Sequence, residues 1–330
     1  MKWMKRVVVC GSAVIDVLVS SKDLKVMKSH MVSGGVAMCE VYGGKSEAEE
    51  IILETGGAGT NVAVGLARLD KTVSVVARIG KDWVGERVIS ALNVAGIDTG
   101  LLQIDQERRT GLSVVLVAND GGRSIITNRG VSKEIEINLI DAKKIKVADW
   151  MQISSLGGKV ELVEDMVGMK GAQTKIGWNP GIGELNQKER VWKILKNIDV
   201  LFLNRMEASK LLEGEFLESK LLAKKIIEKG AKMVVITDGI RGAGVAVENN
   251  WYEADAFKSR SVDDTGAGDA FVSGFVSGLL EDVDILTALK RGLVNGASVV
   301  TYLGAKDGLL TKKKMAKWLQ KRLRMREERL

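Results

Sequence analysis

A glycine-rich turn followed directly by an aspartate is the most chemically informative feature of this sequence. Residues Thr265 to Asp269 read Thr-Gly-Ala-Gly-Asp and lead into an apolar stretch with helical spacing. Glycines before a helix let backbone N–H groups converge on one point, where the helix dipole also favours negative charge. A carboxylate there would repel a bound phosphate, so its presence makes sense if it takes a proton from a group that attacks this phosphate. The turn indicates phosphoryl transfer, with the N–H groups of Gly266, Ala267 and Gly268 as anion hole and Asp269 as general base. The alternative is an ordinary glycine turn capped by aspartate.

A second glycine turn and an isolated aspartate indicate a site for hydroxyl groups. Residues 56–70 read GGAGTNVAVGLARLD, with Gly57 in the turn and Asn61 at the start of a helical pattern. Asp16 interrupts an apolar run, where a carboxylate without a partner is costly. Carboxylate and amide groups hold sugar hydroxyls by paired hydrogen bonds, and a glycine lets a sugar approach the backbone. We expect Asp16, Gly57 and Asn61 to bind an acceptor; alternatively, Asn61 is a helix N-cap and Asp16 a satisfied buried residue.

Polar and glycine residues after two further apolar runs suit a nucleotide. Asn204 and Glu207 are three residues apart, and hence on one side of a helix start. Thr237, Gly239 and Gly242 form a third glycine-bearing turn, which could contact phosphate or ribose. From their own chemistry, Thr237, Gly239 and Gly242 are predicted to lie near the nucleotide.

The elements that must position these residues alternate along the chain. Strands are predicted at 7–11, 73–79, 150–153, 175–178, 200–203 and 233–237. Helices are predicted at 61–69, 86–95, 162–170, 190–197, 219–229 and 288–302. Strands that alternate with helices favour a parallel sheet covered on both faces.

Two segments break this alternation and predict a lid. Strand patterns lie within about 17–55 and 108–128, and the second contains an Asn-Asp-Gly-Gly hairpin turn at 119–122. Placed around a crossover helix, they would project from the main sheet as a small β-sheet. No linker or repeat divides the chain, so we expect residues 1–330 to form a single domain with a lid.

The net charge of +7 is confined to the end of the sequence. Residues 312–330 hold nine Lys/Arg and two Glu, so the remainder sums to zero. A basic C-terminal helix of this kind favours a solvated face over a nucleic-acid-binding arm, and an aromatic content of 5% argues against base stacking. We therefore expect no nucleic-acid partner.

Cysteine usage and hydropathy bound the remaining classes. Cys10 and Cys39 form no CxxC pair, which indicates neither a metal site nor a disulfide framework. No apolar run reaches the length of a membrane span. We expect a cytoplasmic protein with no membrane partner.

Together these motifs resemble a known family. The set comprises the two glycine turns, ARIGKDWVG at 77–85, Thr110–Gly111 and NRME at 204–207. It is similar to the ribokinase-like (phosphofructokinase-B type) family of carbohydrate and nucleoside kinases, from about Val7 to about Ala305. The resemblance implies a ribokinase-like three-layer α/β/α domain with a mostly parallel sheet and a small β-sheet lid. It also implies a carbohydrate kinase that uses ATP, or ADP, as phosphoryl donor.

The resemblance also assigns roles to individual residues. Asp16 and Asn61 match the family's acceptor-binding residues. The family uses the pair that matches Asn204 and Glu207 near the nucleotide phosphates, which implies a Mg²⁺ that Glu207 holds through water. Asn295 matches a residue beside the purine, and Asp263 matches a ligand of a monovalent cation such as K⁺.

The acceptor and the oligomeric state stay open at this point. The acceptor would be decided by lid residues such as Glu40, Tyr42, Arg109, Arg123 and Arg129. Arginines that reach it would favour a phosphorylated or carboxylated sugar. A nucleoside kinase of the same family is the main alternative. A non-catalytic protein that binds sugar or nucleic acid is a remote one, because the whole glycine turn and its aspartate are present. A homodimer formed through the lid is a further expectation.

Overall fold

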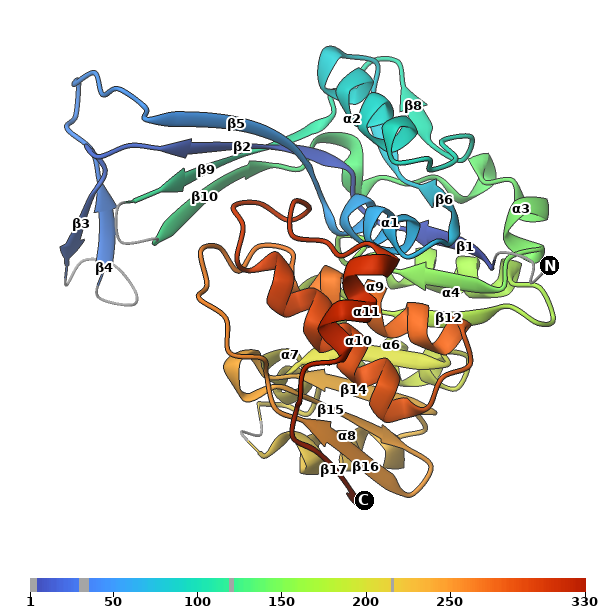
Figure 1. Ribbon diagram of the computed structural model, residues 1–330. Helices are drawn as coiled ribbons and strands as arrows, with labels where there is room; N and C mark the ends of the chain where they lie inside the picture. The colour runs from blue at the N-terminus through green and yellow to red at the C-terminus, as the bar shows by residue number, and fades with distance from the viewer. Residues whose placement is uncertain (1–4, 30–35, 119–121, 215–216) are drawn as a thin grey trace.

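The computed structural model describes residues 5–29, 36–118, 122–214 and 217–330, and one large sheet forms its centre (Figure 1). Within these residues the strands are, in spatial order, β6 (Thr72–Val76), β1 (Arg6–Cys10), β11 (Trp150–Ile153), β12 (Lys175–Trp178), β13 (Val200–Asn204), β14 (Met233–Thr237), β15 (Ala243–Val247), β16 (Asn250–Ala254) and β17 (Met325–Arg329). The strands from β6 to β14 pair in parallel, and the last ones add to them antiparallel. The sheet is therefore mostly parallel, as predicted.

Helices cover both faces of this sheet. One face carries α1 (Ala58–Arg68), α2 (Trp83–Val94), α9 (Ala267–Leu280) and α10 (Ile285–Val299). The other face carries α3 (Ala142–Lys146), α4 (Val160–Met169), α5 (Ile182–Leu185), α6 (Lys188–Leu195), α7 (Arg205–Leu211) and α8 (Ser219–Glu228). Alternate residues of β1 divide between the two cores: Val7 and Val9 pack on the first, Val8 and Cys10 on the second. This confirms the three-layer α/β/α architecture.

A second, smaller sheet projects from the main body as the predicted lid (Figure 1). Its strands are, in order, β10 (Arg123–Asn128), β9 (Gly111–Val117), β2 (Val14–Ser20) and β5 (Glu50–Gly56). Shorter pairs are formed by β3 (Lys25–Lys28) with β4 (Val36–Cys39), at the far end of the lid, and by β7 (Arg78–Gly80) with β8 (Gln103–Asp105). Strands β9 and β10 pair antiparallel, whereas residues 119–121 of the predicted hairpin turn lie outside the described residues.

One face of the lid sheet is apolar and open to solvent. The register aligns Val17 of β2 with Leu53 of β5 and Val114 of β9, and Val114 with Ile126 of β10. Residues aligned in this way share a face of the sheet. Ile51, Leu53 and Ile126 are exposed. An apolar face of this width on a projecting sheet is a candidate contact surface.

The C-terminal segment corrects the prediction of one basic helix over 312–330. Helix α11 (Lys312–Leu319) forms the first part, and Met315 and Trp318 pack it against the body. The chain then leaves the helix, and β17 pairs antiparallel with β16 at the edge of the main sheet. An edge strand offers unpaired N–H and C=O groups, and pairing with them satisfies the backbone of a segment that has no continued apolar stripe.

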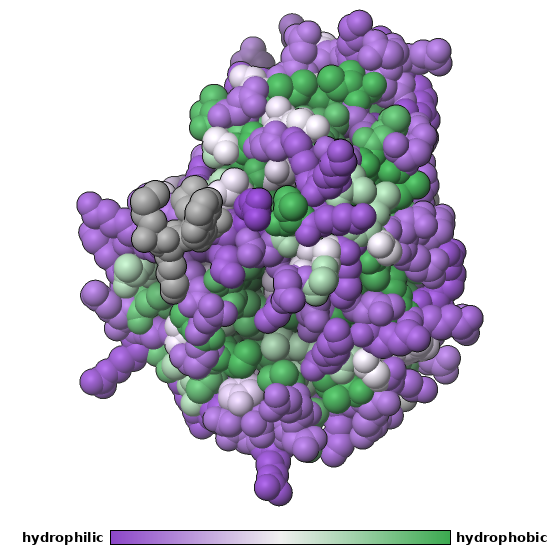
Figure 2. Space-filling view, turned by 90° about the vertical axis from the view of Figure 1, so that its right-hand side faces the viewer, coloured by the Kyte–Doolittle hydropathy of each residue, from purple (hydrophilic) through white to green (hydrophobic). Residues whose placement is uncertain are grey.

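No helix in the described part of the chain is long and apolar enough to cross a membrane. On the face shown in Figure 2, hydrophilic side chains occupy most of the surface and apolar ones are interspersed among them.

Candidate active site

The turn before α9 leaves backbone donors free. Gly266 has a left-handed backbone (φ 74°), and a Cβ there would collide with the loop after α10, so this position requires glycine. The N–H of Ala267 donates to a carbonyl oxygen within the turn at 3.3 Å. Within the described residues, the N–H groups of Gly266, Gly268 and Asp269 have no hydrogen-bond partner. An anion beside this helix N-terminus would therefore find free donors.

Asp269 lies in the first turn of α9 with one carboxylate oxygen engaged. Its Oδ2 accepts a hydrogen bond from Nδ2 of Asn61 at 2.8 Å, and its Oδ1 has no partner among the described residues. Burial raises the pKa of Asp269 to about 6, against the hydrogen bond from Asn61 and the charge of Lys306, which both lower it. At neutral pH this carboxylate is mostly ionised and has a free oxygen, as a general base requires.

The second glycine turn brings Asn61 to this carboxylate. Gly57 has φ 92°, and a Cβ there would collide with the carbonyl oxygen of Ser12. Helix α1 starts directly after Gly57, so Asn61 lies inside the helix and is not its N-cap. Its buried amide instead bonds to Asp269, 208 residues away in the sequence. The two glycine turns therefore meet at one place.

Asp16 lies on β2 at the base of the lid. Its carboxylate occupies the space that a side chain on Gly56 would fill. Burial raises the pKa of Asp16; a hydrogen bond from Ser113 and the charge of Lys306 oppose this rise, and the charge of Asp263 adds to it. Because Lys306 acts on both Asp16 and Asp269, the predicted acceptor residues and the predicted base share one environment.

The structure adds Lys306 and Glu54, which the sequence analysis missed. The ammonium of Lys306 is buried and donates to Oδ1 of Asn61 at 2.6 Å. Burial lowers the pKa of Lys306 to about 8, although nearby carboxylates raise it. Burial also raises the pKa of Glu54 to about 7. Neither residue stands out in the sequence, since a lysine in a polar loop and a glutamate in a half-exposed strand are both common surface features.

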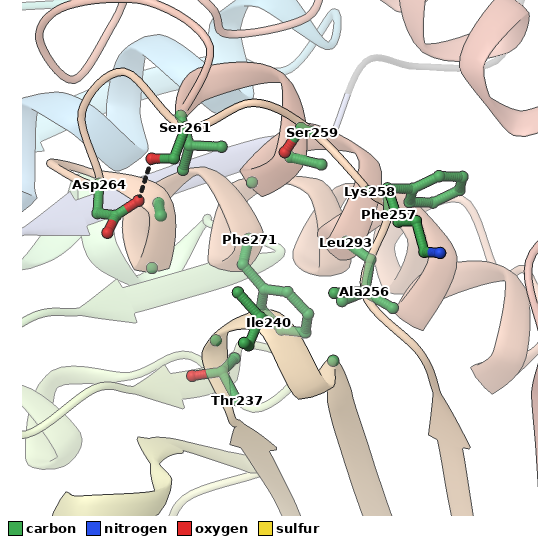
Figure 3. A pocket seen from close by; sticks show the side chains of 17 residues that line it. Thr237, Ile240, Ala256, Phe257, Lys258, Ser259, Ser261, Asp264, Phe271 and Leu293 are labelled. Carbon is green, nitrogen blue, oxygen red and sulfur yellow. Dashed lines mark hydrogen bonds between the residues drawn. The ribbon is translucent and has the colours of Figure 1, made fainter.

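A cavity of about 600 Å³ opens beside the glycine turn at 265–269 (Figure 3). Its lining includes Thr237, Gly239 and Gly242, all predicted to contact a nucleotide. Its walls also hold Ile240 and Phe271, both labelled in Figure 3. A cavity with apolar walls that reaches a helix N-terminus has the size and chemistry to take a base at one end and phosphates at the other.

A smaller cavity of about 140 Å³ adjoins it, because Thr237 and Gly268 line both. Asn204 and Glu207 also line it, and the register of β13 and β14 places Asn204 opposite Thr237 at the carboxyl ends of the strands. The side chain of Glu207 accepts the backbone N–H of Asn204, and the side chain of Asn204 accepts the backbone N–H of Glu207, each at 2.8 Å. Burial raises the pKa of Glu207, and the N–H of Asn204 opposes this rise.

The donor set near these cavities fits a hydrated Mg²⁺ rather than a protein cage. Among the described residues, no group of three or more His, Cys, Asp or Glu could hold a metal ion. Mg²⁺ commonly binds through one or two carboxylates, several waters and the phosphates of the substrate. Glu207, a single carboxylate beside the glycine turn, suits that arrangement.

Asn295 requires a correction. It was predicted to lie beside the purine, but it is fully buried between α9 and α10 and does not line the nucleotide cavity. Its Nδ2 donates to the carbonyl oxygen of Ala270 at 2.8 Å and to Ser273, and its Oδ1 accepts from the N–H of Leu310 at 2.9 Å. This amide holds three segments together, and its neighbours in α10, Gly296 and Leu293 among them, line the cavity instead.

Asp263, the predicted ligand of a monovalent cation, is paired within the chain. Its buried carboxylate accepts from the guanidinium of Arg123 on lid strand β10. The same Oδ1 accepts from the N–H of Thr265 at 2.9 Å, and Oδ2 accepts from the N–H of Gly304 at 3.0 Å. Both oxygens therefore have partners, and a positive charge from the lid lies next to the glycine turn.

Comparisons with known proteins place the whole chain and its fold. The family model described as pfkB family carbohydrate kinase matches residues 4–312. The ribokinase of Haemophilus influenzae is 28% identical over 272 residues, which cover 80% of this chain and 87% of the relative. The solved ribokinase of Thermotoga maritima superposes with a TM-score of 0.79 at 25% identity, over 97% of this chain and 100% of that one. A nucleoside kinase of Methanocaldococcus jannaschii gives 0.76 at 19% identity, over 97% and 99%.

Proposed function

The chain belongs to the pfkB family of carbohydrate kinases, and on this premise we propose that it transfers the terminal phosphoryl group of ATP to a sugar hydroxyl. It is a phosphotransferase with an alcohol group as acceptor. The observation that carries the proposal is the hydrogen bond between Asn61 and Asp269, which joins the two glycine turns. A carboxylate with one free oxygen then lies beside Asn61, a predicted acceptor residue, in the first turn of a helix whose N-terminus has free donors.

The transfer follows from these positions. The acceptor hydroxyl lies within reach of Oδ1 of Asp269, and Asp16 and Gly57 hold its neighbouring hydroxyls. As the hydroxyl oxygen bonds to the terminal phosphorus, its proton passes to Asp269. The bond to the bridging oxygen breaks, and its electron pair leaves with the nucleoside diphosphate. The N–H groups at the start of α9 stabilise the charge on the transferring group.

Two ions belong to the proposal. Mg²⁺ would bind near Glu207 through water and neutralise charge on the donor phosphates. For the site beside Asp263, the family resemblance favours K⁺ or another monovalent cation, whereas the ion pair favours Arg123 as the positive charge. A KCl titration separates the two: activation of the wild type supports the ion. Potassium-independent turnover that becomes potassium-dependent in Arg123→Ala supports the arginine.

A nucleoside kinase is the second candidate, because a nucleoside kinase is among the solved structures with this fold. Both readings share the base and the donor site and differ in the lid. Arg123 is paired with Asp263 through Nη1, so part of its guanidinium is already engaged. Arg109 and Arg129 are exposed and remain the candidates for selecting an anionic acceptor.

The lid also supports a proposal about assembly. The apolar lid face around Leu53 and Ile126 would be covered if two copies paired through it. Sedimentation of the wild type and of Leu53→Lys tests this: a dimer that the substitution dissociates supports it, and a monomeric wild type contradicts it.

The proposed cytoplasmic location is checked by fractionation of the native host.

A phosphoryl-transfer screen tests the proposed function. Sugars and nucleosides are assayed against ATP and ADP with Mg²⁺, with reactions that lack the acceptor as the reference. Acceptor-dependent loss of ATP with a sugar supports a carbohydrate kinase, and the same result with a nucleoside alone supports the second candidate. Absence of acceptor-dependent turnover across the whole panel argues against both.

A further inference from the structure

Lys306 is the one buried cation that touches the acceptor residues in the described part of the chain. It follows α10 in the loop at 300–311, which carries its side chain under the start of α1. Its ammonium donates to Oδ1 of Asn61 at 2.6 Å, to Oγ1 of Thr60 at 3.1 Å, and to the carbonyl oxygen of Thr55. An ammonium has three donors and no acceptor, so these contacts use its full capacity. Lys306 therefore has no donor left for a substrate.

These contacts determine which way the amide of Asn61 faces. An ammonium can only donate, so the atom of Asn61 that meets it must be the carbonyl oxygen. The amide NH₂ then faces the opposite way and donates to Oδ2 of Asp269 at 2.8 Å. A flipped amide would set NH₂ against the ammonium and a carbonyl oxygen against a carboxylate, which is unfavourable at both ends.

We propose that Lys306 is a positioning residue for the general base: it fixes the amide of Asn61, which in turn holds Oδ2 of Asp269 and leaves Oδ1 for the acceptor hydroxyl. The proposal rests on the proposed role of Asp269. It assigns Lys306 no contact with the acceptor or the nucleotide. The chain Lys306–Asn61–Asp269 links the loop after α10, helix α1 and helix α9.

The charges around Lys306 make the hydrogen-bonded chain Lys306–Asn61–Asp269 sensitive to pH. Asp16, Glu54 and Asp269 stabilise its ammonium, whereas burial and the nearby Arg68 oppose it. Asp307 acts on Glu54 from the same loop. Loss of the proton from Lys306, near pH 8, would leave two donors for three acceptors and add a lone pair that can accept, so the amine would no longer fix which end of the Asn61 amide faces it. It would also remove a charge that lowers the pKa of Asp269.

The test measures kcat and both KM values against pH for wild type, Lys306→Met and Lys306→Gln. Met keeps the length of the stem without a donor, so kcat should fall about ten- to hundredfold, as for a lost hydrogen bond to a charged partner. The acidic limb of its pH profile of kcat should move to higher pH, because the charge that lowers the pKa of Asp269 is lost. The nucleotide KM should stay unchanged. Gln keeps a donor for Asn61 that does not titrate, so it should recover part of kcat and lose the alkaline limb that the wild type shows near pH 8.

Lys71→Met is the matched control. Lys71 is also buried, and its ammonium bonds to Glu281 at 2.7 Å and to the carbonyl oxygen of Leu69. Its pairing lies at the end of α1, away from Asp269. This variant should lose stability and keep both limbs of the wild-type profile.

The outcomes separate this inference from the function on which it rests. A folded Lys306→Met enzyme with the wild-type acidic limb overturns the inference. If that variant does not fold, the wild type and Lys306→Gln decide: no alkaline limb in the wild type, or an unchanged one in Lys306→Gln, also overturns it. Near-normal turnover of Asp269→Asn would instead refute the role of Asp269 on which this inference rests, and absence of acceptor-dependent turnover in the wild type would refute the proposed function itself.

Discussion

Replacing Asp269 by Asn should separate stability from activity. The substitution preserves the shape of the side chain, and its Oδ1 can still accept the hydrogen bond from Asn61 that Asp269 now accepts. It removes the ability to take a proton. General-base catalysis is worth about 10²- to 10⁴-fold in rate, so kcat should fall by that factor. This corresponds to a loss of about 3–5 kcal/mol of transition-state stabilisation, and the nucleotide KM should change little.

The same substitution should stabilise the fold above pH 6. Burial raises the pKa of Asp269 from 3.8 to about 6, so the folded protein binds more protons than the unfolded chain between these two values. The contribution of this residue to stability therefore falls as the pH rises through that window. A shift of about two units corresponds to about 3 kcal/mol, which is the upper limit of the gain that Asp269→Asn should show at pH 8.

Two measurements on the same preparations check both parts. Initial rates with saturating donor and acceptor give kcat, and denaturant unfolding at pH 4 and pH 8 gives the free energy of unfolding. We expect a slow variant that is more stable than the wild type at pH 8 and equally stable at pH 4. Near-normal turnover refutes the assignment of the base, and equal stability at pH 8 refutes the argument from burial.

Further predictions concern the other parts of the site. Nothing lies within 4 Å of a Cβ built on Gly268, so Gly268→Val should fold, keep its melting temperature and lose phosphoryl transfer, whereas Gly168→Val, an equally open control on α4, should stay active. Asp16→Ala should raise the acceptor KM about five- to more than a hundredfold and leave the nucleotide KM unchanged, and equal loss for both substrates would contradict this. Asn295→Ala should lower the free energy of unfolding by about 3 kcal/mol with an unchanged nucleotide KM, because its partners are backbone and hydroxyl groups of the fold.

Local patterns were enough to predict the main architecture. The strands predicted at 150–153, 175–178 and 233–237 coincide with β11, β12 and β14, because short apolar runs between polar turns suffice to identify buried parallel strands. The C-terminal strand β17 was missed because its pairing depends on the free edge of β16, which no local pattern reveals.

The residues of the candidate site also divide into those that a local pattern indicates and those whose partners only the fold reveals. Gly57 and Gly266 adopt a positive φ, the conformation for which glycine-rich turns are suited, while their roles in binding stay predictions. Asn295 was misassigned because an isolated amide in a helix gives no indication of which neighbours it will meet. Lys306 was missed for a related reason: its partners come from residues 55–61, and only the fold brings them together.

The order of strands in the main sheet bears on how the protein is assembled during synthesis. From β11 to β17 the spatial order is the chain order, so each new strand can pair with the one made just before it. Growth of the sheet on this side proceeds outward in one direction, and domains form from the N-terminus as the ribosome releases them. At each stage the newest strand is an open edge, which can pair with a second chain. A chain truncated before Met325 would keep the complete candidate site but leave β16 as a permanent open edge, so its characteristic failure should be aggregation rather than loss of chemistry.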